Sequence, residues 1–202
     1  GLAPGECGDD AHNYAWAEVY KAMRAAKKAG WMMHNAKLES HPYLIKKGFP
    51  EGKGYVFDGN LLIPMRVGKE LVGCQIIDPA GGKKFLYGQR TKGAQLVCDN
   101  KGRHILCEGY ATALSVRRAL MMQKCRYTIH VCFSAANMAE IGAWLPNAFI
   151  VADNDASNTG LRAAKKTKCP YWMSPNTGED ANDYEMRVGT EQFGKELVLA
   201  IC

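Results

Sequence analysis

The stretch Phe149-Ile150-Val151-Ala152-Asp153-Asn154-Asp155 is a short apolar run that ends abruptly in two carboxylates. Apolar runs of this length, bounded by turn residues, are typical of buried strands. Asp is depleted in strands and is rarely buried without a partner, so we expect both acids at the end of the strand. Ligands of open α/β sheets bind at such ends. An isolated Asp-x-Asp pair is more often an ordinary loop with an Asx-turn, so the rest of the chain must decide.

The second half of the chain alternates between strand-like and helix-like segments. Regular alternation with nearly continuous apolar strands predicts a mostly parallel, Rossmann-like sheet with helices on both faces. The expected strands lie at 104–107, 127–133, 148–152 and 171–173, and the expected helices at 110–123, 137–145, 159–168 and within 182–202.

The first half of the chain has a different pattern. Residues 11–29 have helical periodicity, and we expect Gly30 to end this helix. The helix carries a basic face, which solvation alone could explain. Three short strand-like runs follow, separated by turn residues, and predict an antiparallel meander over residues 55–77. We therefore expect an α/β fold in which a smaller α+β subdomain, residues 1–102, precedes the catalytic domain, residues 103–202.

Composition limits the class of protein. The 202 residues are 47% hydrophobic and 23% charged, as in ordinary folded domains, and we expect no membrane span. The net charge is +6, mostly in the first half, which suits a polyanionic partner or simply a solvated surface. The eight cysteines include no C-x-x-C pair, which favours free thiols in a reducing cytoplasm over a zinc ribbon or disulfides. Because the chain begins at Gly1, we interpret it as a fragment or as the product of tag removal.

A basic segment precedes the α/β half. Residues 81–93 contain Lys83, Lys84, Arg90 and Lys92, with glycines and two aromatic residues between them. Cationic side chains bind phosphates and aromatic rings stack on bases, so this segment is a candidate nucleic-acid or nucleotide site. A solvated hairpin is the alternative.

Acidic residues follow three of the expected strands. Glu108 ends the first, Asp153 and Asp155 end the third, and Asp180 and Asp183 lie in the loop after the fourth. Crossover connections bring these strand ends to one edge of the sheet. Crowded carboxylates repel one another unless cations lie between them, and hard oxygen ligands suit Mg²⁺ or Mn²⁺. Two such ions can support an in-line phosphoryl displacement.

Other familiar sites do not fit the sequence. A calcium loop starting at Asp153 would have Asn158 in place of its glycine and Ala164 in place of its final glutamate. The chain has no P-loop motif and no G-x-S-x-G or Cys/His arrangement for acyl transfer.

The order of several motifs resembles the Toprim primases of phages and plasmids, which are related to bacterial replicative primases. The Toprim signature is a glutamate after the first strand and Asp-x-Asp after the third. The resemblance extends from about His41 to Gly189 and rests on His41-Pro42-Tyr43-Leu44, Leu61-Leu62-Ile63-Pro64, residues 84–94, Glu108-Gly109-Tyr110-Ala111-Thr112-Ala113 and Ala152-Asp153-Asn154-Asp155.

The resemblance implies roles for the acidic residues. Glu108 would help to hold metal and act as general base, and Asp153 and Asp155 would be the main metal ligands. Either Asp180 or Asp183 would complete the acidic patch.

The resemblance also covers the residues around these acids. Asn154 would be only a spacer, and Lys84, Arg90 and Lys92 would handle template or nucleotide beside the catalytic site. Thr112 stands where many bacterial replicative primases have Asp, which leaves the site with one charge fewer.

We therefore expect the catalytic core of a DNA primase, which synthesises short RNA primers on single-stranded DNA by metal-dependent nucleotidyl transfer. Its partners would be the template, ribonucleoside triphosphates and a replicative helicase in the same or another chain. A Toprim nuclease that uses the same metals, and a non-catalytic module that binds single-stranded nucleic acid, are the alternatives.

Overall fold

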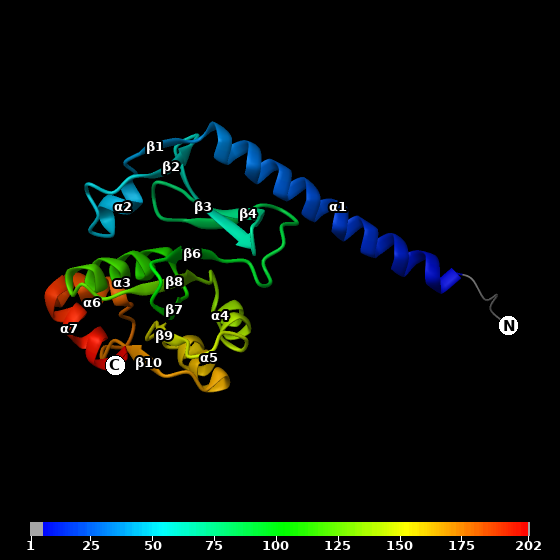
Figure 1. Cartoon of the computed structure of the whole chain (residues 1–202). Helices are drawn as coiled ribbons and strands as arrows, with labels where there is room; N and C mark the ends of the chain where they lie inside the picture. The colour runs from blue at the N-terminus through cyan, green and yellow to red at the C-terminus, as the bar shows by residue number, and fades with distance from the viewer. Residues whose placement is uncertain (1–5, 202) are drawn as a thin grey trace. The chain divides into compact units, whose positions relative to one another are not determined.

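The structure is a computed structural model that describes the backbone of residues 6–201 and the side chains of residues 14–201 (Figure 1). By contacts, the chain divides into two compact units. The first comprises residues 1–43 and 53–91, and the second comprises residues 44–52 and 92–202. The border expected at residue 103 remains a prediction about where independent domains would separate.

The first unit is built on an antiparallel sheet, sheet A, in the order β1-β2-β3-β4-β5. The three central strands are the expected meander, which the structure confirms. The strands are β1 (Lys37–Glu39), β2 (Gly54–Phe57), β3 (Asn60–Val67), β4 (Glu70–Ile77) and β5 (Lys83–Phe85).

Helix α1 (Glu6–Asn35) packs on sheet A with the second half of its length. Ala25, Ala29 and Met32 contact a buried cluster of sheet residues that includes Cys74. The expectation that Gly30 ends the helix is wrong. A single glycine is tolerated in a helix, and the packing of Met32 in the buried cluster stabilises the continuation of α1 to Asn35.

The His41-Pro42-Tyr43 motif leads into the short helix α2 (Pro42–Lys46). The buried His41 ring accepts a hydrogen bond from the Tyr43 backbone N–H at Nδ1, over 3.2 Å. Its Nε2 lies 3.0 Å from the Gly59 carbonyl oxygen and therefore donates to it. His41 thus has a structural role, joining α2 to the β2–β3 turn.

The second unit contains sheet B, in the order β10-β9-β7-β8-β6. Strands β7 to β10 are parallel, and the edge strand β6 runs antiparallel to β8. The strands are β6 (Leu96–Asp99), β7 (Arg103–Cys107), β8 (Tyr127–Val131), β9 (Phe149–Ala152) and β10 (Tyr171–Met173).

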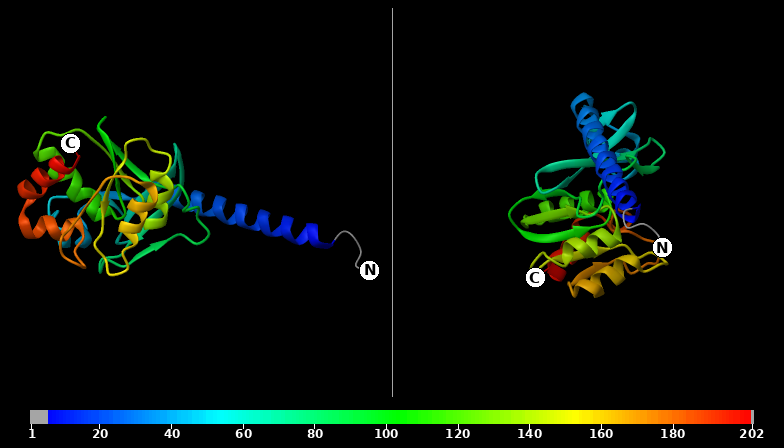
Figure 2. Two further views of the ribbon diagram at one scale, coloured as in Figure 1. Left: turned by 90° about the horizontal axis from the view of Figure 1, so that it is seen from below. Right: turned by 90° about the vertical axis from the view of Figure 1, so that its right-hand side faces the viewer.

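Helices cover both faces of sheet B, as the alternation predicts (Figures 1 and 2). Alternate residues of the strands face opposite sides. Phe149 and Val151 enter the core beneath α3, α6 and α7, whereas Ile150 and Ala152 enter the core beneath α4 and α5. The helices are α3 (Tyr110–Met122), α4 (Ala135–Gly142), α5 (Thr159–Thr167), α6 (Ala181–Val188) and α7 (Thr190–Ile201).

The strand order places a topological switch point between β7 and β9. From β7 the chain crosses through α3 to β8 on one side, then returns through α4 to β9 on the other side of β7. Adjacent strands whose connections leave toward opposite faces are open at their carboxyl ends, where α/β proteins bind ligands. Glu108 follows β7 and Asp153 follows β9.

Residues 44–52 belong to the second unit because an ion pair binds them there. Arg118 of α3 contacts both carboxylate oxygens of the buried Glu185 of α6 over 2.7 Å. The same guanidinium donates to the Gly48 carbonyl oxygen over 2.7 Å and lies over the Phe49 ring, 3.9 Å from its centroid. Asn182 of α6 adds a 2.8 Å hydrogen bond to the Lys47 carbonyl.

Two further expectations concern the whole chain. The six cysteines whose side chains the structure describes are all free thiols, while Cys7 and Cys202 lie outside the described side chains. Among the described residues, no helix has the length and apolar character needed to cross a membrane.

Candidate metal centre

Glu108 occupies the carboxyl end of β7, the central strand of sheet B. Its carbonyl oxygen accepts a 2.8 Å hydrogen bond from the backbone N–H of Phe133, so the chain leaving β8 continues to pair beside it. Phe133 has a φ of +70°, in the left-handed region that bulky residues rarely adopt. Such strained residues gather at functional sites, and no sequence pattern marks this one.

Asp153 lies at the end of β9 among other carboxylates. Burial, followed by the charges of Glu108, Asp180 and Asp155, raises the pKa of Asp153 to about 7. The hydroxyl of Thr112 on α3 lies 3.5 Å from Asp153 Oδ1 and lowers that pKa slightly. Thr112 therefore contributes a weak donor at the position where a further acid would have added to the repulsion.

Asp155 points back into its own loop. Its carboxylate accepts hydrogen bonds from the Ser157 hydroxyl over 2.9 Å, the Thr159 hydroxyl over 2.9 Å and the Thr159 backbone N–H over 3.2 Å. Burial raises the pKa of Asp155, but these hydrogen bonds outweigh it and hold the pKa below its usual value. Asp155 thus fixes the start of α5 and acts on Asp153 through its charge.

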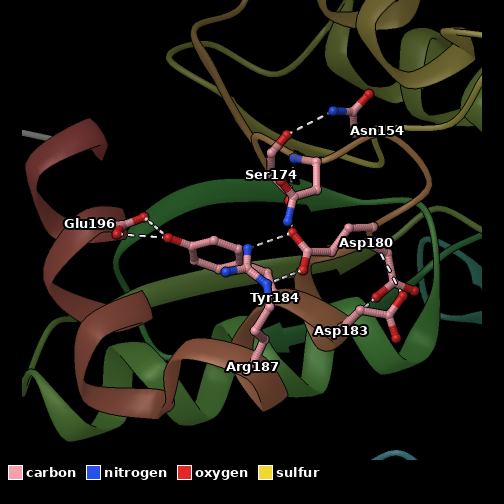
Figure 3. A network of polar contacts seen from close by, with 9 residues as sticks. Asn154, Ser174, Asp180, Asp183, Tyr184, Arg187 and Glu196 are labelled. Carbon is pink, nitrogen blue, oxygen red and sulfur yellow. Dashed lines mark hydrogen bonds and ion pairs between the residues drawn. The ribbon is translucent and has the colours of Figure 1, made fainter.

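Asn154 is more than a spacer, and the sequence-based interpretation of it was wrong. Its side-chain amide donates to the Ser174 carbonyl over 2.9 Å (Figure 3). Its own carbonyl accepts the Gly178 backbone N–H over 2.5 Å. Asn154 therefore ties the loop after β9 to the loop after β10, and its partners lie twenty or more residues away in the sequence.

The loop after β10 contains one acid that is already neutralised. Glu179 receives hydrogen bonds from Arg187 Nε over 2.7 Å and Arg187 Nη2 over 3.0 Å, and also from the Ser174 hydroxyl. These contacts, with Arg187 first, lower the pKa of Glu179 to about 2. Figure 3 shows Arg187 reaching from α6 toward this loop.

Asp180 and Asp183 form a capping box at the start of α6. The Asp180 side chain accepts the Asp183 backbone N–H over 2.8 Å, and the Asp183 side chain accepts the Asp180 N–H over 3.4 Å (Figure 3). Burial and the charge of Asp180 raise the pKa of Asp183. Of the two, Asp180 is the one whose charge acts on Asp153.

These residues fit a hard divalent cation, although within residues 14–201 they form no ready-made cluster of three ligands. Glu108, Asp153 and Asp180 bring negative charge to one place, and their repulsion adds to the effect of burial in raising the pKa of Asp153. A cation there would relieve the repulsion. Mg²⁺ needs only one or two protein carboxylates, because waters and substrate phosphates supply its other ligands.

The same region of the chain matches a known family. Residues 103–191 match the family model of the Toprim domain. This part of the chain is a Toprim domain. A search of curated proteins gave no match. Toprim domains occur in primases, nucleases and topoisomerases, which act on nucleic acids, and they generally bind divalent metal ions.

The four basic residues predicted to bind nucleic acid are divided between the two compact units. Lys83 and Lys84 are neighbours on β5, and the Lys83 ammonium lies 5.6 Å from the Tyr43 ring centroid. Arg90 also belongs to the first unit. Lys92 belongs to the second unit, where its ammonium lies 3.7 Å from a carboxylate oxygen of Glu140 on α4.

The backbone beside Lys92 is anchored by a residue that sequence reasoning missed. Asn137 of α4 accepts the Gly93 N–H over 2.7 Å and donates to the carbonyls of Ala94 and Cys132 over 2.7 and 2.8 Å. It therefore holds residues 93–94 at the end of β8, one strand away from Glu108. Asn at the start of a helix signals only a cap, so its long-range role has no local pattern.

Proposed function

We propose that this chain is the catalytic core of a DNA primase, which makes short RNA primers on single-stranded DNA. One observation carries the proposal. Glu108 and Asp153 follow adjacent strands at the switch point of a Toprim domain, where the charge of Glu108 acts on Asp153. A preceding unit with an exposed basic strand, β5, supports the choice of a polymerase, because a nuclease needs no separate surface for template or nucleotide.

The chemistry assigned to the site is nucleotidyl transfer. The 3′-hydroxyl of one nucleotide attacks the α-phosphorus of a ribonucleoside triphosphate, a new P–O bond forms, and pyrophosphate leaves. Glu108 would accept the hydroxyl proton. Bound Mg²⁺ or Mn²⁺, as one ion or two, would supply charge stabilisation of the attacking and leaving oxygens.

The other acids would support that site in different ways. We assign Asp153 as the principal metal ligand, with Asp180 rather than Asp183 as the additional charge. Asp155 would contribute negative charge while it holds the start of α5. Asn154 would set the distance between the two acidic loops.

The basic residues would handle the polyanionic substrates. Lys83, Lys84, Arg90 and Lys92 are assigned to template and nucleotide phosphates, which they contact as point charges or forks. The motif order favours the primases of phages and plasmids, which act in the cytoplasm with a replicative helicase in the same or another chain.

Template-directed synthesis tests the proposal. The chain is incubated with single-stranded DNA, ribonucleoside triphosphates and Mg²⁺ or Mn²⁺, and labelled RNA products are resolved by size. We expect short RNA that requires template and metal, and that disappears in Glu108→Gln and Asp153→Asn. Metal-dependent cleavage of the DNA without added nucleotides, and no RNA, would instead identify a nuclease.

A further inference from the structure

A hollow beside α1 in the first unit combines cations with exposed aromatic rings. One part of it, about 330 Å³ in volume, is lined by Tyr20, Lys21, Arg24, Lys28 and Tyr87, among others. An adjoining part of about 540 Å³ shares three of these residues and adds Lys27 and Trp31. We call this surface the α1 groove; its described lining includes four cations and no acid.

The cations of the α1 groove lie along one side of the helix. Lys21, Arg24 and Lys28 are separated by three and four residues, so they are neighbours on the helix surface. Lys21 also forms a 2.8 Å ion pair with Glu18 at the margin of the groove. The remaining positive charge faces solvent, where it can follow a chain of phosphates.

The aromatic rings of the α1 groove are exposed to a degree that core packing does not explain. The exposed fractions are 83% for Tyr87, 61% for Tyr20 and 58% for Trp31. Cations lie near two of the rings, with Lys21 Nζ 5.7 Å from the Tyr87 centroid and Arg24 Cζ 5.8 Å from the Tyr20 centroid. Exposed rings among cations are the composition of single-strand binding surfaces, where bases stack while phosphates pair with charge.

The loop that carries Tyr87 is held firmly against the sheet. Gln89 Oε1 accepts the backbone N–H groups of Leu86 over 3.0 Å and Cys74 over 3.2 Å. A Cβ at Gly73 would lie 2.4 Å from the Gln89 side chain, so the glycine makes room for this anchor.

The same loop is pressed against α1 at Gly88. With φ +76°, Gly88 lies so close to the helix that a Cβ there would be 2.7 Å from Lys21 Cβ. The tip of the loop therefore presents Tyr87 beside Lys21 at a fixed place. An exposed ring held by two anchors loses little freedom when a base stacks on it, which favours binding.

We propose that the α1 groove binds single-stranded nucleic acid, with bases stacked on Tyr87, Tyr20 and Trp31 and phosphates on Lys21, Arg24, Lys27 and Lys28. The groove shares Tyr87 with the basic segment at 83–92 that sequence reasoning identified, but its cations all lie on α1. The proposal rests on the proposed function, because it names a surface that would hold the template strand. The expected affinity of the α1 groove for single strands does not depend on metal or on catalysis.

Fluorescence anisotropy with a labelled oligothymidine of about 12 nucleotides, in EDTA, tests the groove directly. We expect the triple variant Lys21→Ala/Arg24→Ala/Lys28→Ala to bind at least about tenfold more weakly and to lower the salt slope by about 2. The charge-matched control Lys69→Ala/Lys165→Ala/Lys166→Ala removes three exposed cations elsewhere and should bind close to wild type. Circular dichroism checks that α1 is retained, as alanine favours helix.

Stacking is tested separately from charge. We expect Tyr87→Ala to weaken binding about fivefold or more, while Tyr87→Phe, which keeps the ring, stays near wild type. Gly88→Ala should weaken binding by displacing the loop from α1. Gly68→Ala has comparable backbone strain at φ +58° with no atom within 4 Å of its Cβ, and should not affect binding.

The outcomes distinguish this proposal from the proposed function. Asp153→Asn should bind the oligonucleotide like wild type in EDTA, whatever its activity. Loss of binding in the groove variants, together with absence of primer synthesis by wild type, would keep the groove and reject the primase. Wild-type binding by the triple variant and Tyr87→Ala would reject the groove. If these two variants bind the oligonucleotide like wild type but, unlike wild type, no longer sediment with phosphatidylserine vesicles, the groove is a membrane-surface site and the proposal is also overturned.

Discussion

The strand ends of sheet B and the α3–α6 helix layer both remove a carboxylate from solvent, but they surround it differently. Glu185 is fully buried and is matched by Arg118 in a bidentate ion pair, with a further hydrogen bond from Thr190 over 2.9 Å. Asp153 is partly buried among carboxylates, with a weak donor in Thr112. A buried carboxylate that forms an ion pair with a side chain of the same fold, as Glu185 does, stabilises the fold. A carboxylate among like charges, as Asp153 is, lowers the stability of the fold unless a cation binds beside it.

The largest effect should follow from removing charge at the strand ends. We expect Asp153→Asn and Glu108→Gln to reduce primer synthesis by more than about 100-fold, since even indirect partners of a metal cost 10- to 100-fold. Glu179→Gln removes a neighbouring acid whose charge Arg187 already offsets, and should keep most activity. Primer yield per unit time at fixed metal concentration measures all three. An equal loss of primer synthesis in all three variants would mean that the total negative charge of this edge matters, and not Glu108 and Asp153 in particular.

The next effect concerns the built-in ion pair. We expect Glu185→Gln to lower the free energy of unfolding by about 3–5 kcal/mol, because it leaves the Arg118 guanidinium without its charge partner. Urea unfolding measures the change. The double variant Arg118→Met/Glu185→Leu should recover much of the loss, since it removes both charges together. A Glu185→Gln protein as stable as wild type would show that the pair contributes nothing to holding residues 44–52.

How far the sequence predicts this molecule depends on whether the decisive contacts are local. Alternation of strands and helices predicts sheet B, and placing acids after strands predicts that Glu108 and Asp153 meet. The hydrogen bonds of Asn154 and Asn137 are not predictable in this way, because their partners lie far along the chain. The positive φ of Phe133 has no signature either, because tertiary pairing with Glu108 imposes it on an unfavourable residue.

A third effect concerns acid stability. His130 of β8 is buried, and its Nε2 lies 2.9 Å from Nδ1 of His104 while its Nδ1 donates to Gln95 over 2.7 Å. Burial, then the charge of His104, lowers the pKa of His130 to about 4, against a small opposing effect of Asp99.

As the pH falls, His130 therefore binds a proton near pH 6.5 in the unfolded chain but only near pH 4 in the folded chain. His130 should contribute up to about 3 kcal/mol of stability above pH 6.5 that is lost as the pH falls toward 4. Urea unfolding between pH 4 and 7 measures this loss, and His130→Gln should reduce its slope. The same slope in both proteins would contradict the assignment.

The smallest effect has the opposite sign to that of Glu185→Gln. At pH 8 without divalent metal, we expect Asp153→Asn to raise the free energy of unfolding by about 1–2 kcal/mol, because it removes one of the repelling charges. Mg²⁺ or Mn²⁺ should stabilise wild type in thermal unfolding and leave Asp153→Asn little changed. A destabilised Asp153→Asn protein would show that Asp153 already has a satisfactory partner.

Direct binding of Mn²⁺, followed by electron paramagnetic resonance, is the sharpest test of the idea that the strand ends of sheet B await a cation. Free Mn²⁺ is titrated into wild type, Asp153→Asn, Glu108→Gln and Glu179→Gln under identical conditions. We expect wild type and Glu179→Gln to bind Mn²⁺ equally, and Asp153→Asn and Glu108→Gln to bind it far more weakly. Unchanged Mn²⁺ binding in Asp153→Asn and Glu108→Gln would contradict the assignment of the metal centre.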